Sequence, residues 1–131
     1  MADEIMDAGK ELRQFPRYNV ASLDKLVGDT DLKKSLMQLV TFAAGGCGFV
    51  DVEGPPVHLT FPKRLVCHFS FEGVTTEKVS VQGNLLYVRE VHTPKLLYFY
   101  GIEFIPGHRE RLSSVLNELQ KLHELGQVKT A

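Results

Sequence analysis

The feature that most constrains this chain is an apolar run, Met37–Val50, that is broken by three glycines within four residues. The run is MQLVTFAAGGCGFV, and its β-branched residues favour a strand over a helix. The glycines at 45, 46 and 48 permit a sharp bend or the close approach of a ligand to the main chain. A basic pair upstream, Arg13 and Arg17, suggests that this bend belongs to an anion site at the mouth of a β-barrel.

Most of the remaining chain alternates apolar and polar residues over short segments, which is typical of half-buried strands. The sequence predicts a turn at Gly28–Asp31 and strands over 18–27, 36–44, 57–61, 65–71, 78–91 and 96–105. Short strands at this spacing favour an antiparallel sandwich or barrel over a parallel α/β sheet.

The apolar period changes from two to three and four after His108. Leucines and Val115 then recur on one helical face, and Gly126 is a good stop, so we expect a C-terminal helix over 107–126 that caps the barrel. The apolar seam is too short to predict a coiled coil. A partner groove or a homo-oligomer formed through this helix stays open as an alternative.

Composition excludes several classes of protein. The chain has 131 residues, which fits one domain, and its formal net charge of −1 gives no overall basic field for DNA, RNA or an anionic membrane. We expect no membrane insertion, because no apolar run approaches the ~18 residues that a span needs. The acidic N-terminus lacks a signal-peptide core, so we expect a cytoplasmic location. Cys47 and Cys67 sit in apolar contexts and are expected to be small buried residues, with a disulfide between them left open as an alternative.

The sequence offers no parts for catalysis. The five histidines are scattered without metal-ligand spacing, so no metal site is expected, and there is no nucleophile elbow, P-loop or dinucleotide fingerprint. We therefore predict a protein that is not an enzyme, with no catalytic residue and no cofactor. Tyr98, Phe99 and Tyr100 offer a stacking face for bases, as in a single-strand-binding module, but without a basic stripe they fit a barrel wall better.

Two short motifs resemble those of the PilZ domain family. The segment Arg13–Arg17, RQFPR, matches the family's RxxxR, and Thr41–Gly46, TFAAGG, falls where the family carries (D/N)xSxxG on a barrel strand. In addition, 100–104 (YGIEF) resembles the strand that closes these barrels and 108–122 resembles the trailing helix. The resemblance covers roughly residues 12–122, and each motif is short.

The resemblance implies a mainly β protein, a six-stranded antiparallel (split) β-barrel with a C-terminal α-helix. Its single domain would comprise an arm (1–17), the barrel (18–105) and the helix (107–126). It also implies a receptor for the bacterial second messenger cyclic di-GMP that signals to motility, pilus or biofilm machinery through a protein partner. The ligand contacts would be Arg13 and Arg17 from the arm, with Thr41 and Gly46 from the strand, and binding would order the arm across the barrel mouth.

The chain departs from the family pattern at two positions. Thr41 replaces the acidic residue and Ala43 replaces the serine, so a charge and a hydroxyl are lost. Each lost hydrogen bond costs roughly 1–3 kcal/mol, and together they would weaken binding by about 30-fold to 10⁴-fold. Two hypotheses follow: either the arginines and Thr41 suffice for the nucleotide, or the chain is a degenerate module that acts purely through protein–protein contacts.

Overall fold

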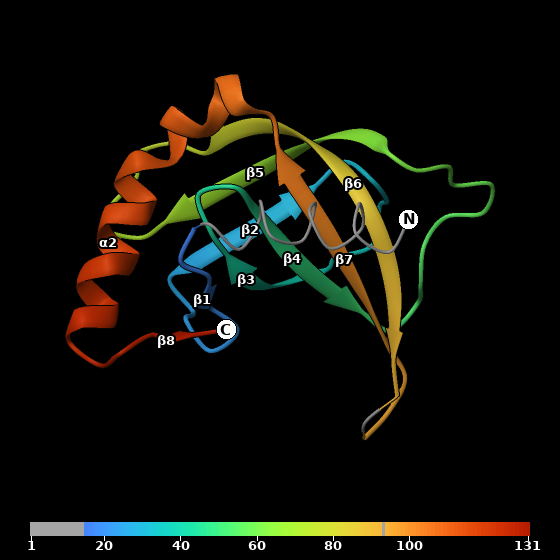
Figure 1. Cartoon of the computed structure of the whole chain (residues 1–131), viewed down its shortest axis with the longest axis horizontal. Coiled ribbons are helices and arrows are strands. Elements are labelled where there is room, and N and C mark those ends of the chain that lie inside the picture. The colour runs from blue at the N-terminus through green and yellow to red at the C-terminus, as the bar shows by residue number, and fades with distance from the viewer. Residues whose placement is uncertain (1–14, 93) are drawn as a thin grey trace.

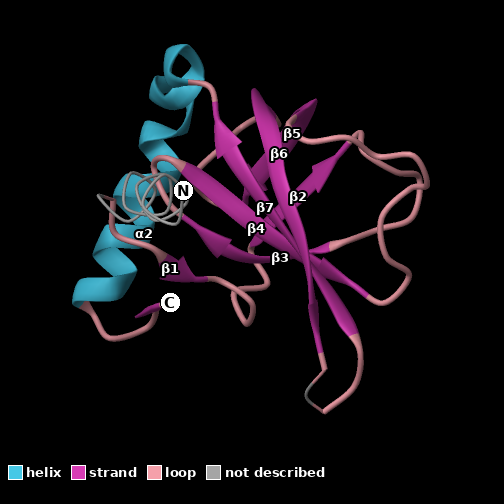
Figure 2. Ribbon diagram, turned by 45° about the vertical axis from the view of Figure 1, so that its right-hand side comes forward, coloured by secondary structure: helices cyan, strands magenta, loops and turns pink. Residues whose placement is uncertain are grey.

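One curled antiparallel sheet forms the body of the protein, and the C-terminal helix packs beside it (Figures 1 and 2). The computed structural model describes residues 15–92 and 94–131. Within these residues the strands are β1 (Tyr18–Asn19), β2 (Leu26–Thr30), β3 (Gln38–Phe42), β4 (Gly46–Asp51), β5 (Lys63–Phe71), β6 (Val79–Val91), β7 (Leu97–Phe104) and β8 (Lys129–Thr130). Their order across the sheet is β2-β5-β6-β7-β4-β3-β1-β8.

The prediction of a mainly β, antiparallel fold with a C-terminal helix is confirmed, but the number of strands and the closure of the barrel are not. Strands β2 to β7 form the body, and the two-residue strands β1 and β8 extend the sheet to eight strands among the described residues. The sheet is not closed, because β2 and β3 approach each other through side chains and no backbone ladder joins them in the described part of the chain. A Cβ built on Gly28 of β2 would lie 3.2 Å from the Leu39 side chain of β3.

Three local predictions are wrong. The predicted strand over 18–27 is strand only at its two ends, in β1 and at the start of β2, and turns lie between them. The alternating segment 57–61 is a loop, in which His58 has a left-handed backbone with φ 61° and Val57 is 84% exposed. Prolines at 55, 56 and 62 flank it and remove backbone donors that a strand would need. The predicted turn at Gly28–Asp31 instead falls largely within β2, where Gly28 provides space for the Phe69 ring of the next strand.

The core is centred on three fully buried phenylalanine rings. Phe42, Phe69 and Phe104 come from β3, β5 and β7, and their ring centroids are 5.0 to 5.8 Å apart. Cys47 and Cys67 are buried in the same core, as predicted, and both are free thiols rather than a disulfide. Burial, followed by the neighbouring thiol of Cys67, raises the pKa of Cys47 well above its ordinary value.

The predicted C-terminal helix is present but divided. It starts as the 3₁₀ segment η1 (Pro106–Leu112) and continues as α2 (Ser113–Glu124), with Gly126 at φ 75° just beyond its end. Leu112, Val115 and Leu119 are fully buried and join the helix to the core. Nowhere in the described part of the chain is a helix both long and apolar enough to cross a membrane.

A histidine joins η1 to the sheet and makes this junction sensitive to pH. His108 Nδ1 accepts a hydrogen bond from the Gln82 backbone N–H at 2.9 Å. Loss of solvation, followed by the charges of Arg111 and Arg64, lowers the pKa of His108 from its ordinary value of 6.5. His108 therefore binds a proton more readily in the unfolded chain than in the folded one. Its contribution to the stability of the fold is complete above pH 6.5 and declines as the pH falls below it.

We expect a His108→Gln variant to show a weaker pH dependence of stability than the natural chain. The glutamine carbonyl can accept the same hydrogen bond but does not titrate. Urea unfolding midpoints of both proteins at pH 7.5 and pH 5.5 test this expectation, because the other histidines are common to both. An equal or larger fall in the midpoint for the variant would contradict it.

Candidate functional site

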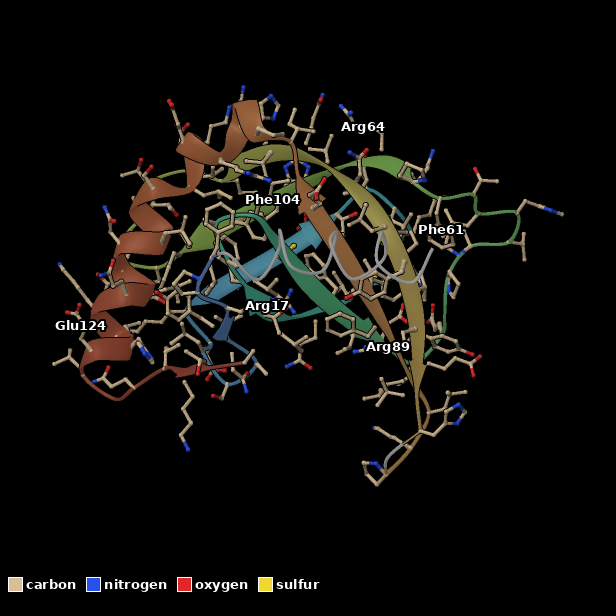
Figure 3. All side chains as sticks on the ribbon, in the orientation of Figure 1. Arg17, Phe61, Arg64, Arg89, Phe104 and Glu124 are labelled. Atoms are coloured by element: carbon tan, nitrogen blue, oxygen red, sulfur yellow. The ribbon has the colours of Figure 1, made fainter. Side chains whose placement is uncertain are left out.

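Three of the four residues predicted to bind the ligand line one small pocket. Arg17, Thr41 and Gly46 come from the segment before β1, from β3 and from β4, and they meet at a cavity of about 20 Å³. The fourth residue, Arg13, lies outside the described residues. Figure 3 labels Arg17 and places it far from Arg64, which lies near the upper edge of the sheet in that view.

The pocket lies on the face of the sheet that points away from the core. On β7, Tyr100, Ile102 and Phe104 are at most 2% exposed, so the alternating residues Phe99 and Gly101 face outward. On β4 the same argument applies, because Phe49 is fully buried and its neighbours in the strand point the other way. The core thus determines which side chains can reach a ligand.

Four residues in register form a row across this outer face. Thr41 on β3 pairs with Gly48 on β4, which pairs with Gly101 on β7, which pairs with Tyr87 on β6. The two glycines leave space that their neighbours fill. A Cβ on Gly48 would lie 2.6 Å from the Thr41 hydroxyl and also collide with the Phe99 ring.

Arg17 is held in place by its neighbours on both sides. Its carbonyl oxygen accepts a hydrogen bond from the Ala131 N–H at 2.8 Å, and the next residue, Tyr18, pairs with both Phe42 and Thr130. On the other side, the guanidinium carbon of Arg109 lies 5.5 Å from the centroid of the Phe15 ring. The C-terminal strand and η1 therefore fix the backbone that carries Arg17 beside the pocket.

The two substituted motif positions both lie at this pocket. Thr41 offers a hydroxyl, whereas Ala43 is 3% exposed and offers no polar group. Among the described residues that line the pocket, none carries a carboxylate. The cation of Arg17 is therefore the charged group at the pocket, and its planar donors suit a phosphate or a base edge.

Of the two aromatic residues at the pocket, the sequence suggests Phe99 only as part of a stacking face for bases, and it does not suggest Tyr87 at all. Tyr87 and Phe99 line it together with Arg17, and the Arg89 guanidinium lies 5.4 Å from the Phe99 ring centroid. The alternation of β7 could have assigned Phe99 to the outer face. Tyr87 could not be assigned in this way, because a register shift between Leu85 and Tyr87 changes the alternation of β6.

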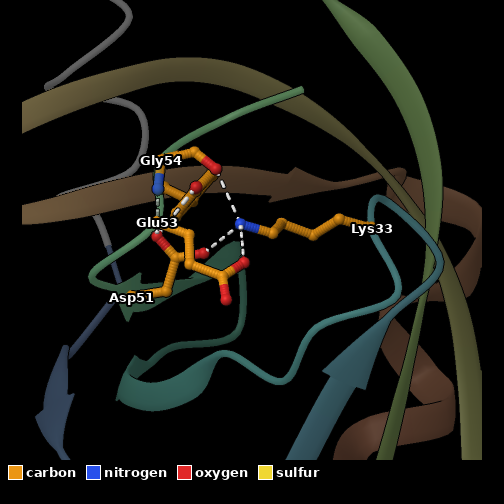
Figure 4. A network of polar contacts seen from close by, with 5 residues as sticks. Lys33, Asp51, Glu53 and Gly54 are labelled. Atoms are coloured by element: carbon orange, nitrogen blue, oxygen red, sulfur yellow. Dashed lines mark hydrogen bonds and ion pairs between the residues drawn. The ribbon is translucent and has the colours of Figure 1, made fainter. Parts of the chain in front are cut away.

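A second polar cluster, at the far end of β4, is structural. Asp51 accepts hydrogen bonds from Lys33 (2.5 Å), the Gly54 N–H (3.1 Å) and the Tyr100 hydroxyl (2.9 Å), as Figure 4 shows for the first two. Burial, followed by the hydrogen bond to Asp51, raises the pKa of Tyr100 above its ordinary value of 10.

No group of side chains in the described residues has the arrangement of a metal site.

Comparison with known proteins assigns the fold. No family model and no curated protein matches the sequence. The structure nevertheless has the PilZ fold. It matches the PilZ domain of YcgR from Escherichia coli, solved with c-di-GMP, at a TM-score of 0.61 and 15% identity, covering 87% of this chain and 95% of that one.

A second solved structure gives the same assignment. The Bacillus subtilis inhibitor of motility, MotI/DgrA, matches at a TM-score of 0.59 and 14% identity over 83% of this chain. The match spans only 52% of MotI/DgrA, about half of its length. At these identities the comparisons establish the fold, and the function has to be argued from the site.

Proposed function

We propose that this chain is a non-enzymatic receptor for cyclic di-GMP that passes the signal to a protein partner in motility, pilus or biofilm machinery. One observation supports the proposal above all. Arg17 precedes Thr41 and Gly46 by more than twenty residues, yet all three line one pocket in a PilZ fold. The solved YcgR domain of this fold contains c-di-GMP.

The chemistry of the pocket suits a cyclic dinucleotide. The Arg17 guanidinium can bind a phosphate through paired N–H donors, and Thr41 can accept a hydrogen bond from a base. Arg13 stands four residues before Arg17 in the sequence, so a phosphate bound at Arg17 would attract both cations. A ligand that orders the arm would change the surface offered to a partner, which is how binding would become a signal.

A second candidate function is a module that binds no nucleotide and acts only through protein contacts. The observation that favours it is the pocket's composition, with Ala43 in place of a hydroxyl and no carboxylate among the described lining residues. This candidate predicts no heat when micromolar protein is titrated with excess cyclic di-GMP. It also predicts that neutralising the arginines leaves partner binding unchanged.

We expect Arg17→Ala to weaken cyclic di-GMP binding by about 10-fold to 100-fold. Hydrogen bonds to charged groups contribute about 1.5–3 kcal/mol, and 1.4 kcal/mol corresponds to tenfold. Isothermal titration calorimetry measures the change. The matched control is Arg64→Ala, because Arg64 bonds to Asn84 and Gln82 on the exposed surface and lies far from Arg17 in Figure 3.

Each outcome of this titration decides between the two candidate functions. Binding by the natural chain and by Arg64→Ala, together with a large loss for Arg17→Ala, supports the receptor. Absence of binding by the natural chain overturns the receptor and supports the interaction module. Equal losses for the two variants would mean that Arg17 acts only through general charge, which also contradicts the proposed site.

A further inference from the structure

The pocket is too small to enclose a nucleotide base. Its volume of about 20 Å³ accommodates about one water molecule. A base bound here must therefore lie over the pocket, against the side chains that surround the pocket. The side chains around the pocket include Arg17, next to β1, and the aromatic residues Tyr87 on β6 and Phe99 on β7.

The two rings lie low against the sheet and nearly parallel to each other. Their centroids are 6.2 Å apart and their planes differ by 22°. Tyr87 leans over Gly101, where an added Cβ would come within 3.0 Å of the ring, and Phe99 leans in the same way over Gly48. Both glycines belong to the row that ends at Thr41, so the rings lean toward the pocket.

The rings are accessible and carry a positive charge nearby. Tyr87 is 37% exposed and Phe99 is partly exposed, so both side chains have surface open to solvent. The Arg89 guanidinium lies 5.4 Å from the Phe99 ring centroid. A phosphate-bearing ligand at the pocket would thus have two cations within reach, Arg17 in the lining and Arg89 at the Phe99 ring.

We propose that Tyr87 and Phe99 form a stacking platform that holds a purine base of the ligand, in place of the acid and hydroxyl that positions 41 and 43 lack. This inference rests on the proposed nucleotide-receptor function. Stacking needs no hydrogen-bond partner on the protein, because every base presents a π-face. Two rings can therefore contribute binding energy where the carboxylate and hydroxyl of the family motif are absent.

The test replaces each ring by leucine, which keeps an apolar side chain over the glycine but removes the π-face. We expect Tyr87→Leu and Phe99→Leu each to weaken cyclic di-GMP binding by about tenfold or more. Tyr87→Phe keeps the ring and should bind within about threefold of the natural chain. Phe61→Leu is the control for loss of an exposed aromatic residue, since Phe61 is 49% exposed and lies away from Arg17 in Figure 3.

A second readout separates stacking from a structural role of the rings. The chain has no tryptophan and four tyrosines, so tyrosine emission reports on the platform directly. A base stacked on Tyr87 should quench part of this emission during the titration, and the quenching should shrink in Tyr87→Phe although binding persists. Thermal unfolding of every variant sets a measurement temperature at which each is folded.

The outcomes distinguish this inference from the receptor proposal. If the natural chain binds and Arg17→Ala does not, but both leucine variants bind normally, the platform is wrong and the receptor stands. If Tyr87→Phe loses as much affinity as Tyr87→Leu, the hydroxyl and not the ring makes the contact, and the platform is again wrong. If the natural chain binds no cyclic di-GMP, both proposals fail.

Discussion

Replacing Gly46 by alanine is expected to destabilise the fold by about 3 kcal/mol, which lowers the melting temperature by about 12 °C in a chain of this size. A Cβ at this position would collide with the backbone carbonyl oxygen of Ile102 on the neighbouring strand β7. Backbone atoms in a paired strand cannot move aside as the tip of a side chain can. Differential scanning calorimetry or circular dichroism on heating measures the shift.

The matched control for this prediction is Gly107→Ala. An added Cβ at Gly107 meets no atom within 4 Å, so its effect should stay within about 1 kcal/mol and could be slightly stabilising. An unchanged melting temperature for Gly46→Ala, combined with loss of nucleotide binding, would contradict the structural role. It would assign Gly46 to direct contact with the ligand instead.

The position of the pocket could be predicted from the sequence because both motifs are local. An arginine segment and a glycine-containing strand can each be recognised without knowledge of their partners, and the structure brings Arg17 and Thr41 together. Gly46 does line the pocket, but the structure gives a different physical reason for a glycine at this position. The sequence suggested close approach of a ligand, whereas the atom nearest to its missing side chain belongs to Ile102 of the adjacent strand.

The features that escaped prediction depend on contacts between distant segments. Whether a curled sheet closes depends on how distant strands meet. Here the Leu39 side chain of β3 lies against Gly28 of β2 without a backbone ladder, and no local pattern records that. Tyr87 reaches the pocket because a register shift in β6 places it opposite Gly101. Alternation within a single strand predicts a face, but it does not predict which residue lies opposite in the next strand.

The Asp51 cluster illustrates the same limit. In the sequence Asp51 directly precedes a segment with a glycine and two prolines, yet its side chain is 5% exposed and bridges Lys33, Gly54 and Tyr100. It therefore holds the end of β4 against β7 and against the segment before β3. This is the strand pair whose register places Gly48 beside Gly101 at the pocket.

We expect Asp51→Ala to cost about 3–5 kcal/mol of stability, because it leaves the buried ammonium of Lys33 without its main partner. The Lys33 side chain is only 11% exposed, and its remaining carboxylate, Glu53, lies 3.6 Å away and is 63% exposed. Chemical denaturation at pH 7 measures the loss. The nucleotide affinity of the folded fraction should fall as well, since the β4–β7 end would loosen.

Glu53→Gln is the matched control, because it removes a carboxylate from the same ammonium at a solvent-exposed position. Exposed ion pairs contribute about 0–1 kcal/mol, so this variant should remain close to the natural chain in stability. If Asp51→Ala proves no more costly than Glu53→Gln, the cluster does not hold the strand end. The Lys33 ammonium would then be adequately stabilised by the Gly54 carbonyl oxygen, which lies 2.6 Å from its nitrogen.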